Sequence, residues 1–406
     1  MRFLTTVFFV FFFGNIFGQI TISGKVVSEK EEPLESASVY FNNTSVGVVT
    51  NEKGEFSITQ PEGAQQLIVS YIGYETIAYS LNESDRKKLL IFKLFPQSNM
   101  LDEVVIKKQH YDEDWYYNLN RFKYAFIGQS ELSQDCEILN PKDILFSFDF
   151  ENNILTADTR KPLKIENKAL GYLITYDLIA FSLSTEKVFF KGYTKFEELK
   201  KGKSKTKKWN KARQKAYNGS MIHFFKALQD QTLQEEGFIV NQFRRVLNPA
   251  RPSEAEIKQA RAYIKEHSDL IDFTKDVSYP ITKADSAVLV TRKIRLPKFL
   301  DMMYATNVSY DTILTTINGM AVLTFEDYLS IVYLNEKEEA RYLNSGYNKE
   351  LRTAGPQTSS ITLLNDKAIL DSSGALLDPL SVFCEGYWAF EKLAETLPLN
   401  YSLPTE

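Results

Sequence analysis

The feature that most constrains the fold of this 406-residue chain is a period-two alternation of apolar and polar residues between Ile20 and Phe95. Turn residues interrupt the alternation roughly every 8 to 12 positions, as at Asn51–Gly54 and Pro61–Gly63. Successive side chains of a β-strand point to opposite faces, so each run places its apolar residues on one face. We therefore predict about seven short antiparallel strands that close into an Ig/transthyretin-like β-sandwich around one core.

Four motifs in this region carry a resemblance. They are Gly24-Lys25-Val26-Val27, Pro33-Leu34-x-x-Ala37-x-Val39, Thr50-Asn51-x-x-Gly54-x-Phe56-x-Ile58 and Val69-Ser70-Tyr71-Ile72-Gly73-Tyr74. Their joint spacing resembles the carboxypeptidase-regulatory-like domain, which is frequent at the N-termini of exported Bacteroidetes proteins, including TonB-dependent nutrient receptors. The resemblance covers residues 19–95 and implies a folding or docking module without catalytic residues.

The first residues predict export. Arg2 precedes an apolar run, Leu4–Phe13, and small and polar residues follow through Gln19. This order is typical of a secretory signal peptide, which we place at residues 1–18. No cysteine follows the run, which argues against a lipoprotein anchor, and no later stretch has about 18 uncharged apolar residues. We expect an exported chain without a transmembrane segment once mature, in the periplasm or associated with the outer membrane.

The segment Leu101–Ile106 has two interpretations. It is similar to the TonB box that follows the same domain in the receptors, and it could add as a strand to the sheet edge of a partner. The alternative is an edge strand or linker. The receptors continue into a plug and a large barrel, which the remaining residues are too few to build, so the second interpretation is favoured. We expect a linker over residues 96–129.

Residues 130–406 predict an α+β domain, or two subdomains, of antiparallel strands with inserted helices. The predicted elements are alternating strands between Phe146 and Tyr193, a helix through Tyr217 and Leu228, a helix after the Ser253–Glu256 capping box, strands after Val277, a hairpin at Asn318-Gly319 and a short helix near Tyr387–Leu393. Several blocks resemble the C-terminal portion of uncharacterised exported Bacteroidetes proteins, which implies no known activity. The blocks are Asn167–Tyr172, Lys215-Ala216-Tyr217-x-Gly219-Ser220 and Gly386-Tyr387-Trp388.

One set of residues suggests a metal. His110 and Glu113 have the His-x-x-Glu spacing of zinc carboxypeptidases, and His223 is a distant third candidate ligand. Catalytic zinc needs three protein ligands and an open water position. However, His110 falls in a charged linker and His223 falls within a helix, and three histidines in 406 residues give such spacing readily by chance. We therefore expect no metal site, and keep a periplasmic zinc-dependent hydrolase as the alternative function.

Nucleophile motifs are weak. The S-x-x-K pattern begins at Ser84, Ser184 and Ser204, each in a charged segment without companion motifs. No G-x-S-x-G, P-loop or dinucleotide motif occurs in the sequence, so no cofactor is expected. Cys136 and Cys384 are the two cysteines, and an oxidised bridge and two buried thiols are equally compatible with the sequence.

Charge gives one further candidate surface. Twelve Lys or Arg residues and two acids lie between Lys187 and Lys215. The stretch Lys200 to Lys215 could therefore contact anionic lipid headgroups. A solvated loop that leads into a helix is the favoured alternative. The net charge of −4 gives no attraction to nucleic acid, and export excludes it as a ligand. The sequence thus predicts a non-catalytic binding or interaction protein of the envelope, with a protein or glycan as partner.

Overall fold

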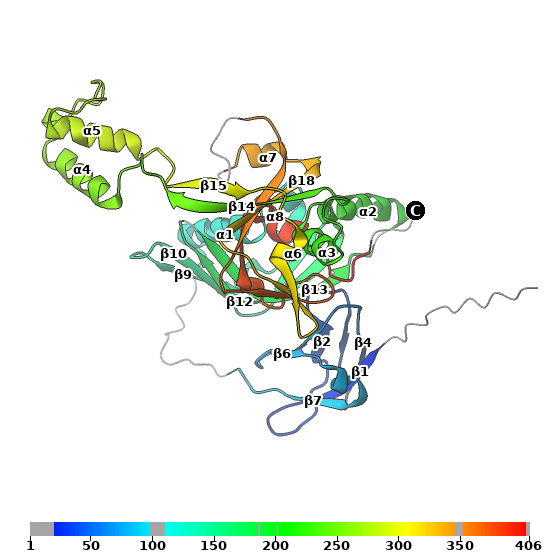
Figure 1. The fold of residues 1–406 in the computed structure, drawn as a ribbon. Helices are drawn as coiled ribbons and strands as arrows, with labels where there is room; N and C mark the ends of the chain where they lie inside the picture. The colour runs from blue at the N-terminus through cyan, green and yellow to red at the C-terminus, as the bar shows by residue number, and fades with distance from the viewer. Residues whose placement is uncertain (1–19, 98–109, 186, 201, 346–351, 403–406) are drawn as a thin grey trace, which may run out of the picture.

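The computed structural model describes residues 20–97, 110–185, 187–200, 202–345 and 352–402. The predicted signal peptide and the Leu101–Ile106 segment lie outside these ranges. Figure 1 shows a small sandwich beside a larger body of sheets and helices, and a helical pair, α4 and α5, that stands away from the body. The predicted β-rich fold class is confirmed.

Residues 20–97 form the predicted sandwich. One sheet has the strand order β4-β1-β7 and the other has the order β3-β2-β5-β6. The strands are β1 (Thr21–Val27), β2 (Ser38–Phe41), β3 (Gly47–Val49), β4 (Glu55–Thr59), β5 (Gln66–Ser70), β6 (Ile77–Ser80) and β7 (Leu89–Lys93). Val39, Phe41 and Leu67 are each 0% exposed in the core between the sheets.

The prediction of purely antiparallel strands is wrong at one pair. Strands β1 and β7 run parallel, with Gly24 opposite Leu90. After β6 the chain passes through a 3-10 helix, Glu83–Lys87, to the other sheet, and it enters β7 in the direction of β1. Alternation of apolar and polar residues is the same for either strand direction, so the sequence pattern could not reveal this.

A six-stranded sheet forms the centre of the body. Its order is β8-β11-β12-β10-β9, and β13 pairs with β12. The strands are β8 (Cys136–Ile138), β9 (Ile144–Asp149), β10 (Ile154–Thr159), β11 (Leu163–Asn167), β12 (Tyr172–Leu183) and β13 (Val188–Glu198). Its core includes Ile174 and Phe196, both 0% exposed. The strands predicted in this region are therefore present.

The linker expected over residues 96–129 needs correction. Its second half contains helix α1 (Glu113–Phe126), and the Asp112 side chain accepts a hydrogen bond from Trp115 N at the helix start. Trp115, Phe122 and Phe126 are buried in the core of the six-stranded sheet. These apolar residues recur with the spacing of a helix face, a signal that the prediction overlooked.

The helix predicted through Tyr217 and Leu228 is in fact two helices, α2 (Lys203–Tyr217) and α3 (Met221–Gln229). Gly219 between them has φ +73°, a conformation that glycine adopts without strain. Ser220 then caps α3, because its side chain accepts a hydrogen bond from His223 N. A single helix was predicted because apolar residues keep a helical spacing on both sides of the break at Gly219 and Ser220.

The last third of the chain contributes two more sheets. A five-stranded sheet has the order β15-β14-β18-β19-β21 and a three-stranded sheet has the order β16-β17-β20. The strands are β14 (Phe238–Leu247), β15 (Phe299–Ala305), β16 (Leu314–Ile317), β17 (Met320–Leu323), β18 (Tyr328–Lys337), β19 (Pro356–Leu363), β20 (Ala368–Leu370) and β21 (Val382–Gly386), with short helices α6 (Tyr310–Ile313), α7 (Ala340–Leu343) and α8 (Tyr387–Glu391). The predicted hairpin is confirmed, since Asn318 and Gly319 both have positive φ between β16 and β17.

Helices α4 (Glu254–Glu266) and α5 (Lys283–Lys293) are inserted between β14 and β15. The capping box of Ser253 and Glu256 at the start of α4 is confirmed. The predicted return to strands directly after Val277 is wrong, because α5 comes first. Thr282 and Asp285 form a second capping box there, which the sequence carried and the prediction missed.

Candidate functional site

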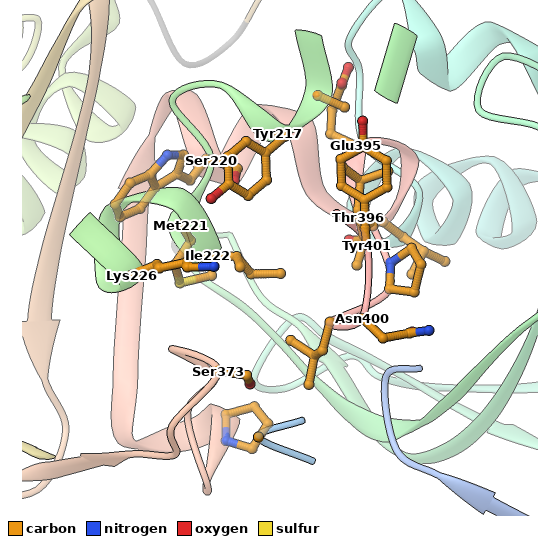
Figure 2. Close-up of a pocket in the computed structure, with 18 of the residues that line it drawn as sticks. Tyr217, Ser220, Met221, Ile222, Lys226, Ser373, Glu395, Thr396, Asn400 and Tyr401 are labelled. Atoms are coloured by element: carbon orange, nitrogen blue, oxygen red, sulfur yellow. The ribbon is translucent and has the colours of Figure 1, made fainter. Parts of the chain in front are cut away.

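A cavity of about 1400 Å³ lies where the sandwich meets the body. This volume exceeds the roughly 300–1,000 Å³ that is typical of small-molecule pockets. The sandwich contributes Ile20, Val46 and residues 59–63, and the body contributes β13, α3 and the C-terminal residues 388–402. Figure 2 shows Lys226 on one side of the cavity, and Glu395 and Tyr401 on another.

Apolar residues, aliphatic and aromatic, make up the larger part of the walls, and polar side chains such as Lys226, Asp230 and Glu395 lie among them. Side chains from all of the contributing segments reach the cavity, including Ile20, Val46, Val188, Ile222, Leu380 and Leu399. Figure 2 shows Ile222 of α3 extending into the space. Such a surface favours apolar groups of a ligand, because removing both from water is favourable.

The loop between β2 and β3 fixes the sandwich to the body through main-chain hydrogen bonds. Asn43 N donates to Thr194 O at 2.8 Å, and Phe196 N donates to Thr44 O at 3.0 Å. The loop therefore runs parallel to β13, like a short additional strand. The Asn42 side chain strengthens this contact by accepting a hydrogen bond from Thr194 N at 2.9 Å.

The same loop also binds the C-terminal segment. Leu399 N donates to Asn43 O at 2.7 Å. The Asn400 side chain accepts from Ser45 N at 2.9 Å and donates to Ser45 Oγ at 2.8 Å. Both β13 and the C-terminal segment line the cavity, so this loop connects the sandwich to two walls that the body contributes.

Two carboxyl groups in the wall are disfavoured as anions. Burial raises the pKa of Glu395 to about 7, and burial together with the neighbouring Glu395 raises the pKa of Glu391 well above its usual range. Among the described residues, neither carboxylate forms an ion pair within 4.0 Å. Buried carboxyl groups with raised pKa values and no ion-pair partner can exchange protons near neutral pH or bind a cationic group.

Lys392 lies between these two residues and is strained. Its φ is +50°, which is uncommon for a residue other than glycine. Its ammonium donates to Ala125 O at 2.7 Å, and burial lowers its pKa to about 8. Backbone strain together with shifted pKa values marks this turn as a candidate part of the site.

The structure does not bring the metal candidates together. No group of three or more His, Cys, Asp or Glu side chains that could hold a metal occurs in the part of the chain that the structure describes. His110 and Glu113 are exposed at the start of α1. His223 is 5% exposed, Gly219 N donates to its Nδ1 at 3.1 Å, and its Nε2 lies 3.1 Å from Glu236 Oε2.

These contacts give His223 a structural role. A main-chain donor occupies the lone pair on Nδ1, so the proton is on Nε2 and is donated to Glu236. Burial lowers the pKa of His223, which the Glu236 carboxylate partly opposes. The imidazole also stacks on Tyr217, with 4.8 Å between ring centroids. It therefore fixes the turn between α2 and α3.

The nucleophile candidates are also dispersed. Ser84 lies in a 3-10 helix, Ser184 follows β12, and Ser204 lies in α2. Cys136 and Cys384 are free thiols, and burial raises the pKa of each to about 12. They pack against different cores, so of the two alternatives the structure has the thiols.

The basic stretch divides into a buried and an exposed part. Arg213 is 6% exposed and lies over the Tyr172 ring at 4.0 Å from the centroid, with Nη1 on Glu198 at 2.7 Å. The exposed basic residues on α2 include Lys205, Lys207, Lys208, Lys211 and Lys215, and Lys215 pairs with Glu339 at 3.3 Å. Contact with anionic lipid through Lys200 to Lys215 stays a prediction.

Sequence reasoning missed Glu391, Lys392 and Glu395. One signal was present: the two acids are four residues apart, a spacing at which like charges disfavour a helix. The sequence alone does not mark these acids as part of a site, because their raised pKa values result from burial in the fold. None of the described helices is both long and apolar enough to cross a bilayer.

Comparison with known proteins identifies the sandwich. Residues 22–106 match the family model described as CarboxypepD_reg-like domain, which confirms the resemblance. The TonB-dependent receptor P39 of Formosa agariphila is 31% identical over 103 residues. That match covers 25% of this chain and 10% of the receptor, so the chain spans about a tenth of the length of this relative. Much of the body that encloses the cavity lies outside residues 22–106.

Proposed function

We propose that this chain is an exported envelope protein that binds a partner, and that the cavity between sandwich and body is its binding site. The observation that carries the proposal is the loop between β2 and β3. Its main-chain hydrogen bonds to Thr194, Phe196 and Leu399 make the CarboxypepD_reg-like domain a fixed wall of the cavity. A domain that in its family serves folding or docking here completes a ligand-sized space.

An envelope location is supported by the family of the sandwich and by the similarity to a TonB-dependent receptor. The predicted signal peptide, residues 1–18, agrees with it. Placement in the periplasm or at the outer membrane belongs to the proposal. So does a linker role for Leu101–Ile106 in preference to a TonB box.

The mixture of apolar and polar groups in the walls, together with the size of the cavity, supports a polypeptide as the partner. Aliphatic side chains such as Ile222 lie beside aromatic rings such as Phe190 and charged groups such as Lys226, a combination that side chains of a polypeptide can match. The volume of about 1400 Å³ suits several side chains of an extended segment. The zinc hydrolase is not proposed further, because its candidate ligands do not converge.

Photo-crosslinking from the cavity tests the proposal. A benzophenone amino acid at Lys226, which reaches toward the cavity in Figure 2, should give one defined polypeptide adduct in the native host. Ile222→Trp should lower the yield of the adduct, because the larger ring occupies part of the space next to Lys226. Ile72→Trp is the matched control, since Ile72 is 83% exposed and does not line the cavity, and it should leave the adduct unchanged. An adduct whose yield is the same in Ile222→Trp as in the wild type, or no polypeptide adduct, would contradict the proposal.

A further inference from the structure

Strand β13 is an edge strand of the six-stranded sheet and lies on the side of the body next to the sandwich (Figure 1). One side of β13 pairs with β12 along the whole strand. On the other side, the loop between β2 and β3 forms main-chain hydrogen bonds only with Thr194 and Phe196. Among the described residues, the first half of β13, residues 188–192, therefore has a paired strand on one side alone.

The hydrogen-bond pattern shows which main-chain groups of this first half point away from β12. Ser184 N donates to Lys187 O at 2.9 Å, so these two residues form a hydrogen-bonded pair where the chain turns from β12 into β13. Hydrogen-bonded and non-hydrogen-bonded pairs alternate along an antiparallel ladder. The N–H and C=O groups of Val188, Phe190 and Gly192 therefore point toward the open side of the strand.

The second half of the strand shows what such groups bind. The same alternation continues to Thr194 and Phe196, whose main-chain groups bind the loop between β2 and β3 at 2.8 and 3.0 Å. Within the described ranges, the main chain of Val188, Phe190 and Gly192 has no such bond to any segment on the open side. An unpaired strand edge of this kind is a template for a further strand.

The cavity runs along this open edge. Val188, Phe189 and Phe190 are consecutive, and all three line the cavity. Their side chains alternate between the two faces of the sheet. The Phe190 ring packs on Phe126, with 5.1 Å between ring centroids, whereas the Phe189 ring packs on Phe383, with 5.5 Å between centroids. A space that reaches successive residues of a strand lies along the edge of the strand, within reach of its main chain.

We infer, on the basis of the function proposed above, that the partner is an extended segment of another polypeptide that adds as a strand to residues 188–192 of β13. The pairing continues the strand-like contact that the loop between β2 and β3 already makes with the second half of β13. A polypeptide main chain offers N–H and C=O groups in the alternation that a strand edge requires. Apolar side chains of the walls, such as Ile222 and Leu380, provide contacts for its side chains.

A proline at position 188 tests the strand addition. Val188→Pro removes an N–H group that faces the open edge and leaves the hydrogen bonds to β12 in place, and proline is tolerated at the first residue of an edge strand. In the crosslinking assay from Lys226, this variant should lower the yield of the polypeptide adduct at least about fivefold, the effect of losing one hydrogen bond. Val188→Ala is the matched control, because it shortens the same side chain and keeps the N–H group. It should retain the adduct.

Hydrogen exchange gives a second readout that needs no proline and decides the question if circular dichroism shows Val188→Pro to be unfolded. The amides of Val188, Phe190 and Gly192 should exchange fast in the free protein and be protected in the purified adduct, whereas the Phe189 amide, which faces β12, should be slow in both.

The outcomes separate strand addition from the proposed function. An adduct that forms equally well in a folded Val188→Pro variant, or that leaves the three amides unprotected, would overturn strand addition while the binding cavity stands. An adduct with a second copy of this chain would overturn the choice of partner. If the protein without the proline gives no adduct, the proposed function itself is contradicted, and strand addition is overturned with it.

Discussion

Glu395→Gln should stabilise the protein at pH 8 and leave its stability unchanged near pH 4.5. Glutamine keeps the size of the side chain and removes its charge. The folded state holds the pKa of Glu395 at about 7, whereas the carboxyl ionises near 4.5 in the unfolded chain. The fold therefore prefers the protonated form, because burial penalises the anion.

The direction and size follow from linkage. A raised pKa contributes stability that is complete below pH 4.5 and is lost as pH rises through about 7. A rise from 4.5 to about 7 corresponds to about 3 kcal/mol at most. The charge of Glu395 contributes to the raised pKa of Glu391, so neutralising Glu395 also removes this repulsion. We expect the variant to exceed the wild type by about 1–3 kcal/mol at pH 8.

Urea unfolding followed by tryptophan fluorescence measures the effect. The three tryptophans, Trp115, Trp209 and Trp388, all lie in the body, so the signal reports the part of the fold that contains Glu395. Glu235→Gln is the matched control, because Glu235 is exposed and outside the cavity. Equal stability of Glu395→Gln and wild type at pH 8, or a difference that persists at pH 4.5, would refute the argument from burial.

Three further outcomes are expected. Gly171→Ala should lower the free energy of unfolding by at least about 2 kcal/mol. Gly171 has φ +74°, and an added Cβ would lie 2.2 Å from the Trp209 ring. An unchanged urea midpoint would contradict this. Cys136 and Cys384, whose pKa values burial raises to about 12, should resist alkylation at pH 8 until the protein is unfolded; a mass shift on reduction alone would instead reveal a bridge. Cell fractionation with N-terminal sequencing should find envelope protein lacking residues 1–18, and cytosolic chain with Met1 intact would exclude export.

The sandwich was predictable because its information is local. Alternating residues such as Val39 and Phe41 and the turn at Gly54 suffice to place strands, and the strand direction of β7 is the detail that such a pattern lacks. Helix α1 was predictable from Trp115 and Phe122 but was overlooked. The glycine at position 219 was visible in the sequence, but one continuous helix was predicted through it.

The cavity was not predictable from the sequence. Ile20, Ile222 and Leu399 meet in its walls although they are far apart in the chain, and no local pattern encodes such a meeting. The shifted pKa of Glu395 depends on burial by these distant segments. The candidate metal ligands illustrate the same limit, because spacing along the chain gives His110 and His223 no relation in space.

The central claim is that the sandwich is a fixed wall of the binding cavity. Hydrogen exchange at the amides of Asn43, Phe196 and Leu399 tests it most directly, because each donates a hydrogen bond across the junction. We expect these three amides to be protected as strongly as the amides of the neighbouring strands. Exchange at the rate of an unstructured loop would show that the sandwich moves independently of the body, and would contradict the account.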